Sequence, residues 1–186
     1  MYKGNIIILG APGSGKGTLT NLLKKKYDYQ SITTGDILRE EKNSGSEIGK
    51  KIKDILGKGN LVPDEIVNQI VSDKIKKIED PYILDGYPRT ISQAEFLDKI
   101  SVVNLVIFLD VSDNTLIERI KNRGKTSGRE DDQKVEIIER RIKQFKNETE
   151  PLIEFYKKSN KLVTIDGEKS IEEVFSQANN IISLWS

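Results

Sequence analysis

The chain has 186 residues, with 30 Lys and Arg against 29 Asp and Glu, so its net charge is only +1. This balance argues against a basic surface for nucleic acid or for an anionic membrane. The chain contains neither cysteine nor histidine. Disulfide frameworks, Cys or His metal sites, and Ser-His-Asp or Cys-His catalysis are therefore excluded. The remaining catalytic groups, which are Lys, Arg, Asp, Glu and the backbone, are those that phosphoryl transfer uses.

The N-terminal residues lead directly into the first apolar run. The sequence shows no signal peptide, no lipidation pattern and no apolar stretch of membrane-spanning length. We therefore expect one cytoplasmic domain with no membrane association. A chain of this length can bury about 70% of its unfolded surface, which is enough for a single core.

The first predicted elements surround the glycine-rich segment GAPGSGKGT at residues 10–18. An apolar run at residues 6–9 precedes it, and leucines with helical spacing follow it. This order predicts a strand, a phosphate-binding loop and the start of a helix. Glycines let the N–H groups of the loop turn inward, and the helix N-terminus adds partial positive charge.

Within this loop, Gly10, Gly15 and Lys16 have Walker A spacing, and Lys16 is expected to reach the outer phosphates of a nucleotide. The pattern departs from the strict motif by one position, because Gly17 follows the lysine and the hydroxyl residue is Thr18. We expect Thr18 to lie beside a Mg²⁺ ion.

Five short apolar runs alternate with helical patterns along the chain. They lie at residues 5–9, 29–32, 81–85, 104–110 and 161–165. Continuous apolar runs of this kind are typical of buried parallel strands. The expected fold is α/β: a P-loop NTPase-type doubly wound five-stranded parallel sheet with helices on both faces. Ligands bind such sheets at the carboxyl ends of the strands.

Residues 33–62 form an excursion between the second and third strands. Thr34 is expected to cap a first helix, residues 47–56 form a second, and Pro63 starts a third. The glycines at 57 and 59 and the proline would let this subdomain swing.

Later in the chain, residues 133–158 predict one long, bent helix, and residues 170–184 predict a terminal helix. The polar, glycine-containing segment 125–132 lies just before the long helix. It is a second candidate for a moving element.

The third strand ends in Asp85, which could act as a Walker B-type group that holds water of a magnesium shell or could simply cap the loop. Arg89 follows on a tight turn, and its planar fork suits bidentate phosphate contact. Gln93 lies four residues on, on the same helical face, where its amide could read a base edge.

The second half of the chain is rich in arginine. Most of these side chains are expected to be solvated, but Arg123 and Arg129 bracket the glycine-containing loop and could meet over bound phosphates. The arginines in question are Arg119, Arg123, Arg129, Arg140 and Arg141.

Five segments together carry a resemblance to the adenylate kinase family. They are GAPGSGKGT, TTGDILR, GNLVPDE, DGYPRT-x-x-Q and RGKTSGRxDD, and they cover nearly the whole chain in the family's order and spacing. The resemblance implies that ATP is bound by Gly13, Ser14, Gly15, Lys16, Gly17, Thr18, Arg119, Arg123 and the Lys169 backbone. It implies that AMP is bound by Thr34, Arg39, Asn60, Leu61, Val62, Gly86, Tyr87, Pro88, Arg89 and Gln93.

The resemblance also implies that Arg129 and an arginine of the long helix bridge the phosphates of the two nucleotides. This chain has one residue more than the family pattern between them, so the second arginine is Arg140 by counting forward and Arg141 by counting back from Pro151. We favour Arg141, because packing of the downstream helix should set the register. The expected catalytic set is Lys16, Arg89, Arg123, Arg129 and Arg141, with Thr18 and Asp85 at the magnesium.

The family's domain plan assigns residues 1–32, 63–123 and 132–186 to the core, residues 33–62 to a nucleoside monophosphate-binding subdomain and residues 124–131 to a short lid. Because the lid is short, the resemblance implies no structural zinc.

The expected activity is reversible transfer of a phosphoryl group from Mg-ATP to AMP, giving two ADP, by a protein that we expect to be a monomer. Thr34 favours AMP over the closest alternative, a UMP/CMP kinase. An alternative of another class is a catalytically weak nucleotide sensor or assembly factor.

Overall fold

The computed structural model describes residues 4–58, 60–78, 81–127 and 132–185. Its centre is one five-stranded sheet in the order β2-β3-β1-β4-β5, in which every neighbouring pair of strands is parallel. The predicted fold class is therefore confirmed, and each strand lies within a residue or two of its expected range. The strands are β1 (Ile6–Gly10), β2 (Gln30–Thr33), β3 (Tyr82–Asp85), β4 (Leu105–Asp110) and β5 (Leu162–Asp166).

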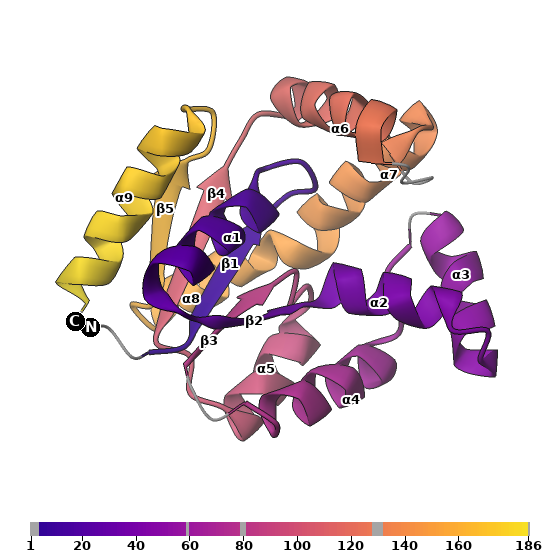
Figure 1. Cartoon of the computed structure of the whole chain (residues 1–186), viewed down its shortest axis with the longest axis horizontal. Helices are drawn as coiled ribbons and strands as arrows, with labels where there is room; N and C mark the ends of the chain where they lie inside the picture. Colours follow the sequence, from indigo (N-terminus) through magenta and orange to yellow (C-terminus); the bar gives the residue numbers. More distant parts are fainter. Residues whose placement is uncertain (1–3, 59, 79–80, 128–131, 186) are drawn as a thin grey trace.

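Helices cover both faces of the sheet (Figure 1). Side chains alternate across a strand, so Ile6 and Ile8 pack on one face while Ile7 and Leu9 pack on the other. The first face is covered by α1 (Lys16–Tyr27) and α9 (Ile171–Leu184). The second is covered mainly by α4 (Asp64–Ile75), α5 (Ile91–Ile100) and α8 (Pro151–Lys158).

The excursion after β2 consists of α2 (Thr34–Asn43) and α3 (Glu47–Gly57), which lie together at one end of the molecule (Figure 1). The Ser46 side chain caps α3 by accepting from Gly49 N–H at 2.8 Å. The prediction that Thr34 caps the first helix is wrong, because Thr33 occupies the cap position. The Thr34 hydroxyl donates instead to the Gly86 carbonyl at 2.7 Å, since β2 and β3 end side by side.

The predicted long helix is present but changes character in the middle. It consists of α7 (Val135–Gln144), a π-helical turn η2 (Phe145–Thr149) and α8. In the π turn, the N–H of Glu150 donates to the carbonyl of Phe145, five residues earlier, at 2.9 Å. Before α7 lies α6 (Asp113–Ser127), which follows β4.

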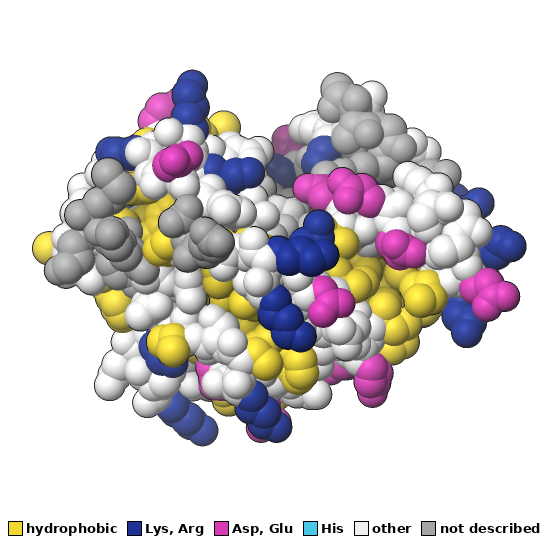
Figure 2. Space-filling view, turned by 60° about the horizontal axis from the view of Figure 1, so that its bottom comes forward, with side chains coloured by type: hydrophobic (Ala, Val, Ile, Leu, Met, Phe, Trp, Pro, Cys, Tyr) yellow, Lys and Arg dark blue, Asp and Glu magenta, His cyan; other side chains and the backbone are white. Residues whose placement is uncertain are grey.

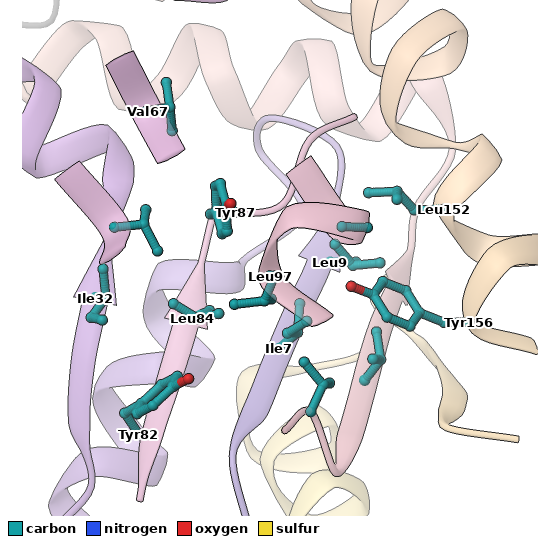
Figure 3. Packing of buried hydrophobic residues seen from close by; sticks show 14 of the residues in the cluster. Ile7, Leu9, Ile32, Val67, Tyr82, Leu84, Tyr87, Leu97, Leu152 and Tyr156 are labelled. Carbon is teal, nitrogen blue, oxygen red and sulfur yellow. The ribbon is translucent and has the colours of Figure 1, made fainter. Parts of the chain in front are cut away.

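Of the three tyrosines buried in the apolar cluster on the second face, Tyr87 and Tyr156 differ in the hydrogen bonding of their hydroxyls (Figure 3). The Tyr87 hydroxyl donates to Asn68 Oδ1 at 2.7 Å and lies 3.2 Å from the Gln93 carbonyl oxygen. The Tyr156 hydroxyl has no hydrogen-bond partner within the described part of the chain. Burial raises the pKa of both phenols, so both stay neutral.

We predict opposite effects of removing these two hydroxyls. Tyr87→Phe should lower the free energy of unfolding by about 1–2 kcal/mol, because the partly buried Asn68 amide loses its hydrogen bond. Tyr156→Phe should be neutral or stabilising, because it removes an unsatisfied hydroxyl. Urea unfolding of both variants beside the wild type measures the difference. Equal destabilisation by the two substitutions would contradict this account of the core.

Candidate active site

The carboxyl ends of all five strands meet at one edge of the sheet, and a cavity of about 1240 Å³ lies there. The loop after β1 lies along it, as do the ends of β2 and β3 and the turn after β5. Because parallel strands all end at the same edge, loops far apart in sequence supply one site.

The loop at residues 10–18 wraps around the Lys16 ammonium. Gly13 and Gly15 have φ values of 84° and 97°, which favour glycine. A Cβ at Gly13 would lie 2.8 Å from an Ile120 side-chain carbon, so the loop also packs tightly on α6. Lys16 Nζ donates to the carbonyls of Gly10 and Ala11 at 2.8 and 2.9 Å. The curled backbone at the start of α1 therefore has the conformation expected of a phosphate-binding loop.

Desolvation by burial lowers the pKa of Lys16 to about 8. The nearby Asp85 carboxylate opposes this shift, whereas the guanidinium groups of Arg89, Arg123 and Arg141 add to it. These charges are therefore close enough to influence one another. An anion in the cavity would relieve the repulsion among the four cations.

Asp85 is 5% exposed at the end of β3, and its Oδ2 accepts from Thr20 Oγ1 at 3.5 Å. Burial raises the pKa of this carboxyl, while Lys16 and Arg89 lower it. Thr18 is exposed on the first turn of α1 and also lines the cavity. One carboxylate and one hydroxyl next to a phosphate-binding loop suit Mg²⁺, which keeps several waters and uses phosphate oxygens as ligands.

Arg39 and Arg89 lie on the side of the cavity nearer to α2. Arg89 Nε donates to the Gly86 carbonyl at 2.8 Å, and the Arg89 backbone N–H donates to Gln93 Oε1 at 2.7 Å. Arg39 is half-buried and forms an ion pair with Asp36 on the same helix. Both guanidinium groups belong to residues that line the cavity.

Arg123 of α6 and Arg141 of α7 converge on one buried carboxylate. Asp132 accepts from Arg123 Nε at 2.6 Å and Nη2 at 2.9 Å, and from Arg141 Nη1 at 2.7 Å. Burial alone would raise the pKa of Asp132, but the two arginines outweigh it and hold the pKa below its ordinary value. Asp132 therefore fixes two cations from different helices at the cavity wall.

The neighbouring Arg140 points elsewhere. It is exposed, and its Nη1 donates to the Lys58 carbonyl at 2.8 Å. Of the two alternatives, only Arg141 lines the cavity. Arg129 lies outside the described residues.

The structure brings most of the expected residues to this cavity. Arg119 also lies there, where its Nη1 donates to the Gly167 carbonyl at 2.8 Å. The expected residues that line the cavity are Gly13, Ser14, Gly15, Lys16, Gly17, Thr18, Arg39, Asn60, Leu61, Asp85, Gly86, Pro88, Arg89, Arg119, Arg123, Arg141 and Lys169.

Four expected AMP-binding residues are buried and are not part of this lining. Val62 and Tyr87 belong to the apolar cluster, and Thr34 is bonded to Gly86. Gln93 is 1% exposed, and its Nε2 donates to Asp64 Oδ1 at 2.7 Å. Both ends of its amide are thus bonded to protein groups in this structure, and base reading by Gln93 stays a prediction.

Sequence reasoning missed two residues at this site, Asp132 and Thr149. The signal in the sequence for Asp132 is an acidic residue within an arginine-rich segment. The second is a threonine in a helix, and only the π turn aims it at Arg89, whose carbonyl accepts from its hydroxyl at 2.8 Å.

A parallel α/β sheet, a phosphate-binding loop after β1, a carboxylate at the end of β3 and convergent arginines define a P-loop phosphotransferase. The family model described as adenylate kinase matches residues 8–161. The chain therefore belongs to the adenylate kinase family.

Full-length relatives agree with this assignment. A protein of Encephalitozoon cuniculi named adenylate kinase is 42% identical, with 98% of this chain and 99% of the relative covered. A Flavobacterium johnsoniae adenylate kinase is 40% identical, with 96% and 97% covered. An Alkaliphilus oremlandii adenylate kinase is 41% identical over 215 residues, with 97% and 98% covered, so this relative has residues without a counterpart here.

None of the described helices is long and apolar enough to cross a membrane. Within the described ranges, no group of three or more acidic side chains is arranged to hold a metal ion. Figure 2 shows basic, acidic and apolar side chains mixed over one face of the molecule.

We predict that Asp132→Asn lowers the free energy of unfolding by about 2 kcal/mol at pH 7, because two partly buried arginines lose their counter-charge. The pKa of Asp132 is depressed in the folded protein, so its contribution is complete above the ordinary Asp pKa of about 4 and disappears as the pH falls through the lower folded value. Urea unfolding of wild type and variant at pH 7 and at pH 3 measures the gap, which should narrow at pH 3.

Asp113→Asn is the matched control, because the Asp113–Lys146 ion pair is half exposed. It should change stability little at either pH. A gap for Asp132→Asn that does not depend on pH would contradict the charge argument.

Proposed function

We propose that this protein transfers the γ-phosphoryl group of Mg-ATP directly to AMP across the cavity, giving two ADP, and that the residues of the cavity divide into a donor half and an acceptor half. The observation that carries this proposal is the presence of Lys16, Arg89, Arg123 and Arg141 in one cavity at the carboxyl edge of the sheet.

The donor half is the phosphate-binding loop with the residues near β5. The loop amides and the dipole of α1 would hold the β- and γ-phosphates, and Lys16 would turn from the carbonyls of Gly10 and Ala11 towards them. Arg119 and Arg123 would also contact ATP. The backbone at Lys169 would contact the adenine.

The acceptor half lies between α2 and β3. Arg39 and Arg89 would hold the AMP phosphate, since a guanidinium can offer two parallel N–H donors to it. The backbone at Asn60 and Leu61, together with Gly86 and Pro88, would shape the rest of the AMP site.

Members of this family use Mg-ATP, and the residues present fit the metal. Thr18 would lie beside the ion and Asp85 would hold water of the magnesium shell. Bound Mg²⁺ neutralises charge on the phosphates and helps orient them.

The transfer itself needs no covalent enzyme intermediate. The protein has to align the two nucleotides and stabilise the charge that develops on the transferred group. Lys16, Arg89, Arg123 and Arg141 would supply that charge, with Arg129 as an expected fifth cation. Exclusion of water from the cavity would strengthen each contact and prevent hydrolysis of ATP.

Two segments of the chain would move when the nucleotides bind. Residues 33–62 would close over AMP, and residues 124–131, of which 128–131 lie outside the described residues, would close over ATP as a short lid. The absence of cysteine and histidine supports a lid without structural zinc. The large exposed apolar side chains of the described residues are spread over α3, α5, α7 and both ends of α9, and this spread supports a monomer. We expect the protein to act in the cytoplasm, where ATP and AMP are its substrates.

The direct test is a phosphoryl-transfer assay with Mg-ATP and each of AMP, UMP, CMP, GMP and dTMP. AMP should be strongly preferred, and Arg89→Ala should lower kcat/KM for AMP by at least about 100-fold, because the acceptor phosphate loses its fork. Preference for UMP or CMP would overturn the acceptor site but keep the mechanism. Absence of transfer to all five would favour a nucleotide sensor.

Arg141→Ala and Arg140→Ala form a matched pair for the same assay. Arg141→Ala should lower kcat by about 100-fold or more, whereas Arg140→Ala should stay close to wild type. The reverse order would show that the other register of the long helix is the functional one.

A further inference from the structure

Thr149 is a buried residue at the end of the π turn, and its hydroxyl reaches the backbone of Arg89 in the turn after β3. Its side chain is 8% exposed, and Oγ1 donates to the Arg89 carbonyl at 2.8 Å. The two residues are 60 positions apart in sequence, so this contact ties η2 to the turn after β3. Thr149 and Arg89 both line the main cavity.

The π turn explains why Thr149 can make this contact. Eight residues separate Arg141 from Thr149, and in a regular α-helix they would turn through about 800°, leaving the two side chains roughly 80° apart. A π turn spreads one turn over more residues, so the rotation is smaller. Thr149 is thereby brought back towards the face that carries Arg141, and both side chains reach the cavity.

The Arg89 main chain is held on its other side as well. Its N–H donates to Gln93 Oε1 at 2.7 Å, and Gln93 is fixed in turn by Asp64 Oδ1 at 2.7 Å. Both main-chain polar groups of Arg89, its N–H and its C=O, are thus bonded to buried side chains, one from α5 and one from η2. The side-chain Nε donates to Gly86 O, which fixes the start of the guanidinium as well.

We propose that Thr149 is a positioning residue that sets the place of the Arg89 guanidinium through its main-chain carbonyl. This inference rests on the proposed contact of Arg89 with the acceptor phosphate. A catalytic cation must be held within about 0.5 Å of its productive place, and an anchor on a rigid helix provides such precision. Thr149 touches no reacting atom in this role.

The test compares Thr149→Val, which keeps the shape but loses the hydroxyl, with Thr149→Ser, which keeps the hydroxyl. Steady-state kinetics are measured with AMP and ATP varied separately. Thr149→Val should lower kcat/KM for AMP about tenfold, with kcat reduced and the KM for ATP within about twofold of wild type, because loss of one buried hydrogen bond is worth about that factor. Thr149→Ser should restore at least half of the wild-type value.

Thr149→Ala provides a second variant should valine fail to fold, and it should show the same selective loss. Thr164→Val, at an exposed threonine of β5, controls for the substitution itself. Urea unfolding shows whether each variant is folded. The inference is overturned if Thr149→Val or Thr149→Ala behaves like wild type, if serine fails to rescue, or if the KM for ATP rises as much as that for AMP.

Combining Thr149→Val with Arg89→Ala separates the two proposals. If Thr149 acts through Arg89, the substitution should cause less than about a twofold further loss in the Arg89→Ala background. A full tenfold further loss would indicate an independent structural effect. Near-normal activity of Arg89→Ala alone would instead remove the proposed role of Arg89, whatever Thr149 does.

Discussion

The structure depends on keeping several positive charges close together in one cavity. Arg89, Arg123 and Arg141 all influence Lys16, whose pKa falls to about 8 through burial and the three guanidinium groups. Such crowding costs free energy in the folded protein, and two buried carboxylates, Asp85 and Asp132, partly offset it. Polyphosphate binding would offset the rest. The cavity is therefore organised for anions before any nucleotide arrives.

The fold can hold these charges close together because they come from different rigid elements. Lys16 starts α1, Asp85 ends β3, and Arg123 and Arg141 lie on α6 and α7. Parallel strands bring these elements to one edge, and the side chains are fixed by bonds to backbone carbonyls or buried carboxylates. A site of this kind needs little reorganisation in the transition state, which is the main source of electrostatic catalysis.

Much of this was predictable from sequence, since the apolar runs, the glycine loop and the arginine spacing are local signals. The β1 loop and the strands follow directly from residue pattern. What local signals could not supply is the partner of a side chain. Thr34 bonds to a carbonyl of the neighbouring loop instead of capping its helix, and the Gln93 amide is occupied by Asp64 and the Arg89 backbone. Likewise, the orientation of Thr149 depends on a π turn, which a helical apolar pattern does not reveal.

The claim that crowded cations are relieved by the nucleotide is tested most directly by proton uptake on Mg-ATP binding. Calorimetric titrations at pH 8, in buffers of high and low ionisation enthalpy, measure the protons taken up. With the pKa of Lys16 at about 8 in the free protein, binding should take up about half a proton at pH 8 and much less at pH 6.5. Lys16→Met should take up none. Binding without proton uptake at pH 8, or equal uptake by the variant, would contradict the account.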